Sequence, residues 1–288
     1  MLIILAFIMN DIITINANGY FEESSPLQKS SSRYQINECL VSENTRFSHT
    51  VIVSSPDYGN MLFLDGELQS SSYDEAIYHE TLVHPIMNVY ADCVDKHILV
   101  IGGAEGATVR EVLKWTNIKI VEWVDIDDRL VNLCRKHLKY ADEPLYTDER
   151  VYRFTDDIMN HLENVIEPIY DIIIIDLPDP DTEMKTPLYG PDFWFKIKRA
   201  LKSGGGIVTH VGPVEPGFGR QIGLNMIQNG VGYCGFPYHT FIPSFQSEWG
   251  FWLSSKPAKS AFPKECIIMN TDYQNTIFHW DNHWCLNK

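Results

Sequence analysis

Residues 98–125 constrain the fold more than any other part of this 288-residue chain. Residues 98–101 form a short apolar run, which predicts a buried parallel strand. Three glycines follow almost at once: Gly102, Gly103 and Gly106. Apolar residues at helical spacing come next, and a second apolar run at 118–124 ends in Asp125. Strand, glycine turn, helix, strand and acid is an order that holds nucleosides, because glycines let the backbone approach the ligand and the acid binds ribose hydroxyls.

Glu105 lies inside the glycine turn and changes which nucleoside we expect there. A dinucleotide site binds a pyrophosphate through free backbone N–H groups. A carboxylate beside those groups would repel phosphate and attract a cation. We therefore interpret the turn as a site for a positively charged nucleoside of the S-adenosylmethionine type. The alternative is an ordinary strand-to-helix turn that binds no ligand.

Acidic residues follow four of the predicted strands. They are Glu105, Asp125, Asp156 and Asp176, with Asp179 close behind the last. The carboxyl ends of parallel strands meet at one edge of a sheet, where ligands bind. Like charges gathered there destabilise a fold unless a cation lies among them, so the pattern predicts a crevice for a positively charged ligand. Asp176 or Asp179, in a loop stiffened by two prolines, is suited to accept a proton from an alkylammonium; a proline-rich turn without function is the alternative.

Strands alternate with helices from residue 74 onward, including helices at 129–138 and 191–201 and a terminal antiparallel pair at 240–242 and 249–254. This alternation predicts an α/β class, a Rossmann-like, mostly parallel sheet of the methyltransferase type that occupies residues 74–288. A helix at 74–90 is expected to be kinked or interrupted at Pro85.

Residues 1–73 are expected to form a small N-terminal antiparallel β domain, with strands at 34–40, 49–54 and 60–64. The serine-rich stretch 18–32 is interpreted as a loop. Residues 2–9 are apolar but are too short to span a membrane, and no basic residue precedes Lys29, so we expect a cytoplasmic protein rather than a secreted one.

The formal charge is −15, from 38 acids against 23 Lys and Arg. Nucleic acid is therefore not an expected partner, since binding phosphates requires a basic face. A cationic substrate is favoured, although solubility alone also explains such a charge. The six cysteines include no CxxC pair, so no zinc site is expected. Glu75 and His79 share a helix face but lack a third ligand, and we predict no metal.

Five segments together resemble the polyamine aminopropyltransferases, the spermidine and spermine synthase family. The segments are 64–69 (LDGELQ), 74–80 (DEAIYHE), 102–106 (GGAEG), 125–127 (DID) and 176–180 (DLPDP). Their number and order make the match specific, and it extends from about residue 20 to residue 256. Within the family the chain is similar to the thermospermine synthase branch, in Glu105, in Asp125 and in the stretch 242–250 that contains Phe245.

The resemblance implies a role for each matching residue. The residues that would hold decarboxylated S-adenosylmethionine, as a co-substrate and not as a tightly bound cofactor, are Gln69, His79, Gly102, Gly103, Glu105, Asp125 and Asp156. Asp176 would activate the attacking amine. Those that would position the polyamine are Tyr78, Asp179, His210 and Phe245. The resemblance also implies a homodimer.

Three departures from the family pattern concern acceptor choice. Ala104 narrows the glycine loop, Ser48 stands where Gln is frequent, and His210 occupies a position often held by Gln. We expect transfer of an aminopropyl group to a polyamine, with spermidine favoured as acceptor and putrescine as the alternative. Two other interpretations are a non-catalytic polyamine- or nucleoside-binding homologue and a methyltransferase that uses intact S-adenosylmethionine.

Overall fold

The computed structural model describes residues 19–25, 30–179, 188–214, 229–232, 235–256 and 262–279. The apolar run at 2–9 and Pro180 lie outside these ranges. Within the described ranges, no helix combines the length and apolar character needed to cross a membrane.

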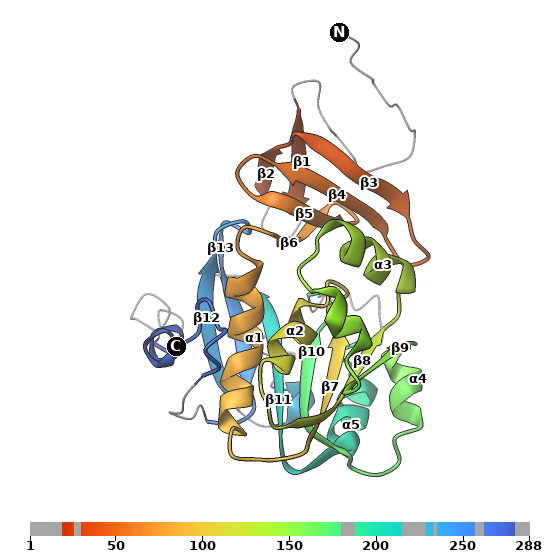
Figure 1. Cartoon of the computed structure of the whole chain (residues 1–288), viewed down its shortest axis with the longest axis vertical. Helices are drawn as coiled ribbons and strands as arrows, with labels where there is room; N and C mark the ends of the chain where they lie inside the picture. The colour runs from red at the N-terminus through yellow and green to blue at the C-terminus, as the bar shows by residue number, and fades with distance from the viewer. Residues whose placement is uncertain are drawn as a thin grey trace.

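A seven-stranded sheet forms the larger part of the molecule (Figure 1). Five parallel strands lie side by side: β11 (Leu201–Pro213), β10 (Tyr170–Asp176), β7 (Lys96–Gly102), β8 (Ile118–Asp125) and β9 (Val151–Thr155). Two strands, β13 (Ser247–Leu253) and β12 (Phe236–Ile242), extend the β11 edge in antiparallel fashion. This topology confirms the predicted Rossmann-like class and brings the carboxyl ends of the parallel strands to one edge.

Helices cover both faces of the sheet, which explains the continuous apolar runs in the sequence. On β7, Ile98 and Val100 pack in one core cluster, while Leu99 and Ile101 belong to another. The first cluster includes side chains of α1 (Glu75–Val89), α2 (Ala107–Leu113), α3 (Asp128–His137) and α7 (Thr271–Ile277), and the second includes side chains of α4 (Ile158–Glu163) and α5 (Pro191–Ala200). A 3-10 helix, Glu143–Thr147, precedes β9.

The N-terminal strands lie at one end of the molecule, above the larger sheet in Figure 1. A four-stranded antiparallel sheet contains β3 (Glu38–Asn44), β4 (His49–Ser55), β5 (Gly59–Leu64) and β6 (Glu67–Ser71). A separate hairpin joins β1 (Tyr20–Ser25) to β2 (Ser30–Gln35). The prediction of a loop at 18–32 is therefore wrong. Phe21 and Tyr34 are partners in this hairpin and bury their rings against Phe63, which outweighs the weak strand propensity of the serines.

Helix α1 runs through Pro85 without a break, so of the two outcomes expected there, a kink or an interruption, the interruption does not occur. Proline cannot donate to the carbonyl four residues earlier, which here belongs to Thr81. The hydroxyl of Tyr238, on β12, donates to that carbonyl at 3.0 Å. A side chain from the sheet thus supplies the hydrogen bond that the helix lacks, and the helix stays continuous.

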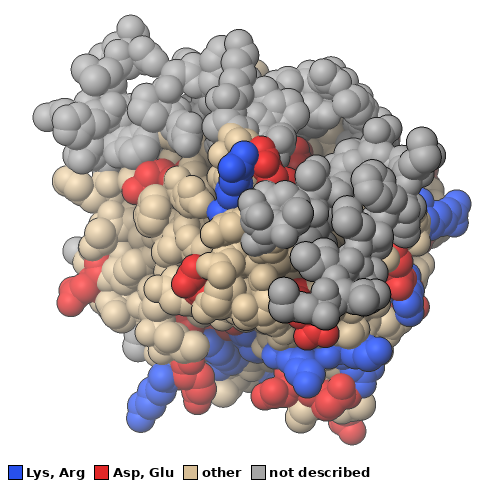
Figure 2. All heavy atoms as spheres, turned by 90° about the horizontal axis from the view of Figure 1, so that it is seen from above, with Lys and Arg blue, Asp and Glu red and all other residues tan. Residues whose placement is uncertain are grey.

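Charged side chains are intermixed on the described part of the N-terminal face. Figure 2, which views this face, shows Lys and Arg beside Asp and Glu along its lower edge. The ion pairs of the chain include Arg129 with Glu43 at 2.6 Å. The part of this face that the structure describes shows no continuous basic surface of the kind that phosphate backbones require.

Candidate active site

The glycine turn lies directly against Asp176 at the end of β10. The Gly103 N–H donates to the Asp176 carbonyl at 3.0 Å. Gly102 and Gly103 have φ of +78° and +68°. A Cβ at Gly102 would lie 2.2 Å from the Asp176 carbonyl oxygen, and one at Gly103 would lie 2.8 Å from Asp176 Oδ2. Only glycine accommodates both the backbone conformation and this close approach.

Two hydroxyl groups hold the Asp176 carboxylate. Tyr78, on α1, donates to Oδ1 at 2.8 Å, and Thr108, on α2, donates to Oδ2 at 2.5 Å. Thr108 is buried, and Asp176 is partly buried. Each carboxylate oxygen keeps a second lone pair, so the oriented group can still accept a proton.

Glu105 and Asp125 carry raised pKa values. Burial raises the pKa of Glu105, and the negative charge of Asp176 raises it further. Burial is also the main reason that the pKa of Asp125 rises to about 7, with a contribution from Glu105, although the Asp127 N–H donates to its carboxylate at 2.8 Å. Glu105 therefore lies within electrostatic reach of both aspartates, as the sequence predicts.

Among the described residues, these acids have no Lys or Arg partner within ion-pair distance. The acids concerned are the five at the strand ends: Glu105, Asp125, Asp156, Asp176 and Asp179. Like charges in a partly buried site raise the free energy of the ligand-free protein. A cationic ligand is the group that would lower it.

Of two further predicted residues, Asp156 is hydrogen-bonded to the acid cluster through its backbone, and Gln69 is not. Asp156 follows β9, and its N–H donates to the Asp125 carbonyl at 3.1 Å, so these two acids end neighbouring strands. Gln69 lies on β6 in the N-terminal sheet, and its amide donates to the Glu67 carbonyl at 3.1 Å. Among the described residues, no hydrogen bond joins Gln69 to the acids.

His79 is buried and is oriented by a charged neighbour. Its Nδ1 lies 2.9 Å from the Glu75 carboxylate, which also accepts two hydrogen bonds from Arg110. Burial opposes the charged imidazole, but the hydrogen bond and charge of Glu75 raise the pKa of His79 overall. Burial likewise opposes ionisation of Glu75, yet His79 and Arg110 lower its pKa to about 2. The Glu75–His79 pair is therefore part of an ion-pair network that fixes the imidazole.

Several aromatic rings lie close to the Tyr78 ring. The Tyr78 ring lies 6.0 Å from that of His210 and 6.3 Å from that of Phe245. Trp249 contacts both of these residues, at 6.1 Å from His210 and 4.7 Å from Phe245. Such a wall suits the alkyl chain of an amine and its positive charge.

A buried carboxylate fixes the turn that carries Phe245. Asp74, at the N-terminus of α1, accepts hydrogen bonds from the Ser244 N–H at 2.6 Å and from the Ser244 hydroxyl at 2.9 Å. Tyr34 of the N-terminal hairpin donates to the Ser244 carbonyl at 3.0 Å. The aromatic wall is thus held by both parts of the chain.

Comparison with known proteins identifies the family of this chain. A model described as the spermine/spermidine synthase domain matches residues 75–264, and one described as the spermidine synthase tetramerisation domain matches residues 19–72. The chain belongs to the spermine/spermidine synthase family. It is 36% identical to a polyamine aminopropyltransferase of Pyrobaculum aerophilum over 234 residues, which cover 79% of this chain and 78% of the relative. It is 34% identical to one from a Synechococcus strain over 233 residues, which cover 80% of this chain and 74% of that relative.

Solved structures of spermidine synthases share the fold of this synthase-family chain. One, in complex with the transition-state analogue AdoDATO, superposes with a TM-score of 0.82 at 22% identity and covers 96% of both chains. The Thermotoga maritima enzyme superposes with a TM-score of 0.80 at 21% identity, also over 96% of both chains.

Three residues that contribute to the site were missed as site residues at the sequence level. Thr108 binds Asp176, Arg110 binds Glu75, and Trp249 packs on His210. Thr108 had a usable signal, because the first turn of a helix that follows a glycine loop points back toward the strand ends. The other two depend on contacts between segments far apart in the synthase-family sequence.

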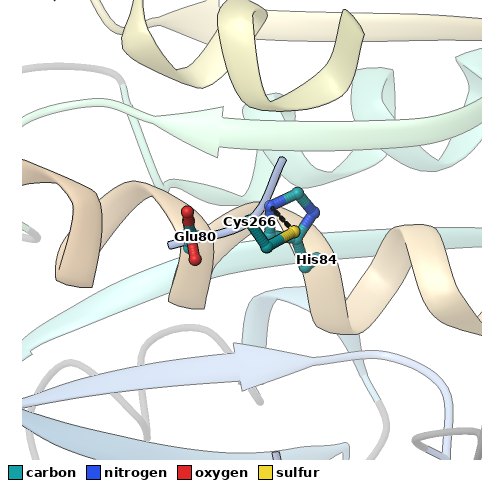
Figure 3. A group of neighbouring side chains, drawn as sticks. All are labelled: Glu80, His84 and Cys266. Atoms are coloured by element: carbon teal, nitrogen blue, oxygen red, sulfur yellow. Dashed lines mark hydrogen bonds between the residues drawn. The ribbon is translucent and has the colours of Figure 1, made fainter. Parts of the chain in front are cut away.

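A cluster of metal-ligand residue types lies outside this site. Figure 3 shows Glu80 and His84 on α1 beside Cys266, the one group among the described residues whose ligand atoms lie close enough to share an ion. Trp115 donates to His84 Nδ1 at 3.0 Å, so Nε2 carries the hydrogen that faces Glu111 at 2.9 Å. A metal would need that nitrogen's lone pair, so the imidazole is in the wrong tautomer for one.

The carboxylate oxygens of Glu80 in this cluster already accept hydrogen bonds. Its carboxylate accepts hydrogen bonds from three consecutive backbone N–H groups, which belong to Ile267, Ile268 and Met269. Burial is the main cause that raises the pKa of Cys266 to about 12, so its thiol stays protonated. The cluster fastens residues 266–269 to α1.

Proposed function

We propose that this family member transfers the aminopropyl group of decarboxylated S-adenosylmethionine to a polyamine nitrogen and releases methylthioadenosine. The amine lone pair attacks the carbon bonded to sulfur, the C–S bond breaks, and its electron pair goes to the sulfur. The observation that carries the proposal is the Asp176 carboxylate, held by Tyr78 and Thr108 beside the glycine turn.

In this reaction Asp176 acts as the general base. It takes the N–H proton of the amine as the new C–N bond forms. Because Asp176 has two fixed hydrogen bonds, its free lone pairs point in defined directions, and alignment supplies much of the rate of a one-step displacement.

The donor is proposed to lie along the strand ends. Gly102 and Gly103 let it approach the backbone, Glu105 faces the sulfonium, and Asp125 binds the ribose hydroxyls. Asp156, beside Asp125, would bind the adenine amino group. Gln69 and His79 would hold the aminopropyl end. This last assignment depends on the family resemblance, since Gln69 is not joined to the acids.

The acceptor is proposed to lie between Tyr78, Asp179 and the aromatic wall of His210 and Phe245. Spermidine is favoured over putrescine, with thermospermine or spermine as the product. The support is the aromatic wall, in which Trp249 contacts both Phe245 and His210, and the resemblance to the thermospermine branch. A longer amine buries more methylene groups against such rings.

Two measurements test the function. Purified protein is incubated with decarboxylated donor and a panel of amines, and the products are identified by mass spectrometry; absence of any aminopropylated amine rejects the proposal. Asp176→Asn should lower turnover by roughly a hundredfold or more, the range for loss of a general base. Asp192→Asn, an exposed acid on α5, is the matched control and should leave turnover unchanged.

The same proposal includes assembly and domain organisation. We propose a boundary between residues 73 and 74 and an oligomer that involves the N-terminal domain, because the tetramerisation model matches residues 19–72. A homodimer is the assembly expected from the resemblance, and light scattering of the purified protein separates dimer from tetramer. The cytoplasmic location stays a prediction.

A further inference from the structure

His210 is a buried histidine with one ring nitrogen left without a hydrogen bond. Its Nε2 lies 2.5 Å from the Leu177 carbonyl, which can only accept, so Nε2 carries a hydrogen. The residue is 3% exposed, and its Nδ1 has no hydrogen-bond partner in the described structure. A buried polar atom of this kind is unusual, because it loses its water without replacement.

A carboxylate oxygen lies close to this nitrogen. Asp179 Oδ1 lies 3.3 Å from Nδ1, and the Asp179 side chain is 43% exposed. With a neutral imidazole, both atoms are hydrogen-bond acceptors that face each other, and neither satisfies the other. The two acceptors are both satisfied only when an N–H donor or a proton lies between them.

Two species can satisfy both the Nδ1 atom of His210 and the Asp179 carboxylate: an alkylammonium and a proton. An alkylammonium carries N–H donors and a positive charge, so it can bind Nδ1 and the carboxylate together. Alternatively, a proton on Nδ1 converts the pair into an imidazolium–carboxylate ion pair. The two outcomes exclude each other, because a protonated imidazole has no lone pair left and repels an ammonium.

We propose that His210 and Asp179 form a seat at which a proton competes with an ammonium of the polyamine acceptor, so that acidification weakens amine binding. This inference depends on the proposed function for the identity of the amine. Histidine suits the task, since its charge ordinarily changes between about pH 5 and 8. Glutamine, which the family often has at this position, would bind the Leu177 carbonyl but could not titrate.

The groups around the imidazole support this competition. Tyr78 faces it from α1, Trp249 stacks on it from β13, and Asp179 approaches from the loop after β10. Burial holds the pKa of Tyr78 well above its ordinary value, so its hydroxyl stays neutral. Among these neighbours, Asp179 is therefore the group that contributes charge at the seat. Asp176 is hydrogen-bonded to the Tyr78 hydroxyl.

The test measures spermidine binding without turnover. Isothermal titration of spermidine into protein saturated with methylthioadenosine gives Kd at pH 5.5 and pH 7.5. We expect the ratio of Kd at pH 5.5 to Kd at pH 7.5 to be about tenfold larger in wild type than in His210→Gln. The glutamine side chain keeps a donor for the Leu177 carbonyl. His97→Gln is the control, because His97 also faces a carboxylate, Glu122 at 2.8 Å, but lies at the amino end of β7. Its ratio should equal that of wild type.

Equal ratios in wild type and His210→Gln overturn the proposal. Asp179→Asn is a second variant, expected to bind spermidine more weakly at both pH values and with little pH dependence. If the amine panel yields product but the His210→Gln ratio matches wild type, this inference fails while the proposed function stands. If no product forms but the ratios differ as expected, the seat exists and the transfer reaction is what fails.

Discussion

Substitution of Gly103 by alanine isolates the close approach of the glycine turn to the general base. The backbone at Gly103 has φ of +68°, which costs an L-residue about 1–2 kcal/mol. The new Cβ would lie 2.8 Å from Asp176 Oδ2, so roughly half an ångström of movement is needed to restore ordinary contact. Tyr78 and Thr108 fix the same carboxylate, so this movement would disturb at least one of their hydrogen bonds.

The expected result is a large loss of turnover with a modest loss of stability. A displacement of about 1 Å can cost around a hundredfold in rate, so we expect kcat to fall by at least about tenfold. The free energy of unfolding should fall by about 1–3 kcal/mol, since the contact adds to the backbone cost. Steady-state assays of aminopropyl transfer and urea unfolding measure the two effects on the same preparation.

Gly204→Ala is the matched control. Gly204 has φ of +80°, but a Cβ there would meet no atom within 4 Å. It should therefore cost about 1–2 kcal/mol of stability and leave kcat unchanged. Wild-type turnover in Gly103→Ala, or an equal loss of turnover in Gly204→Ala, would refute the reasoning that the close approach positions Asp176.

Three other perturbations test separate parts of the site. Thr108→Val removes the shorter hydrogen bond to Asp176 and should lower kcat about tenfold, whereas Thr108→Ser should retain most activity; equal rates for the two variants would contradict this role. Asp74→Ala leaves two buried donors of Ser244 unpaired, so stability should fall by about 2–3 kcal/mol and KM for the amine should rise, while calorimetry shows the Kd of the donor unchanged. Because the pKa of Asp125 is raised from 3.8 to about 7, the ligand-free protein should gain stability as pH falls from 7 toward 4, and ionisation of Asp125 should be required for donor binding. The Kd of the donor should then rise up to about tenfold per pH unit below about 7, with proton release detectable by calorimetry in buffers of different ionisation enthalpy; no proton release would contradict the assignment.

The central sheet could be predicted because its signals are local. The run at 98–101 is apolar throughout and the run at 118–124 is mostly apolar, broken by Lys119 and Glu122, since both faces of the sheet are covered; each run ends in glycine or acid. The acids at the strand ends follow from the same rule, because parallel strands present their carboxyl ends at one edge. Glu105, Asp125 and Asp176 therefore come together as expected.

The errors arose where distant contacts override local propensity. The hairpin at 20–35 forms around the pair Phe21 and Tyr34, although serines dominate its sequence. Pro85 remains inside α1 because Tyr238, more than 150 residues away, supplies the missing hydrogen bond. Neither partner is identifiable from a single sequence, since nothing in the local pattern indicates which remote side chain will arrive.

The position of Asp176 relative to Glu105 and Asp125 also bears on the direction of charge movement. In the proposed displacement, positive charge leaves the sulfur, which becomes a neutral thioether, and appears on the acceptor nitrogen. Asp176 is the acid joined to Tyr78, whose ring contacts the aromatic wall, so it lies on the side where the proposed acceptor would gain its charge. An acid so placed interacts more strongly with the transition state than with the bound reactants, and only such a difference accelerates the chemical step. Glu105 and Asp125, which interact with the charge at its starting point, contribute to binding the donor, and their attraction weakens as the neutral product forms.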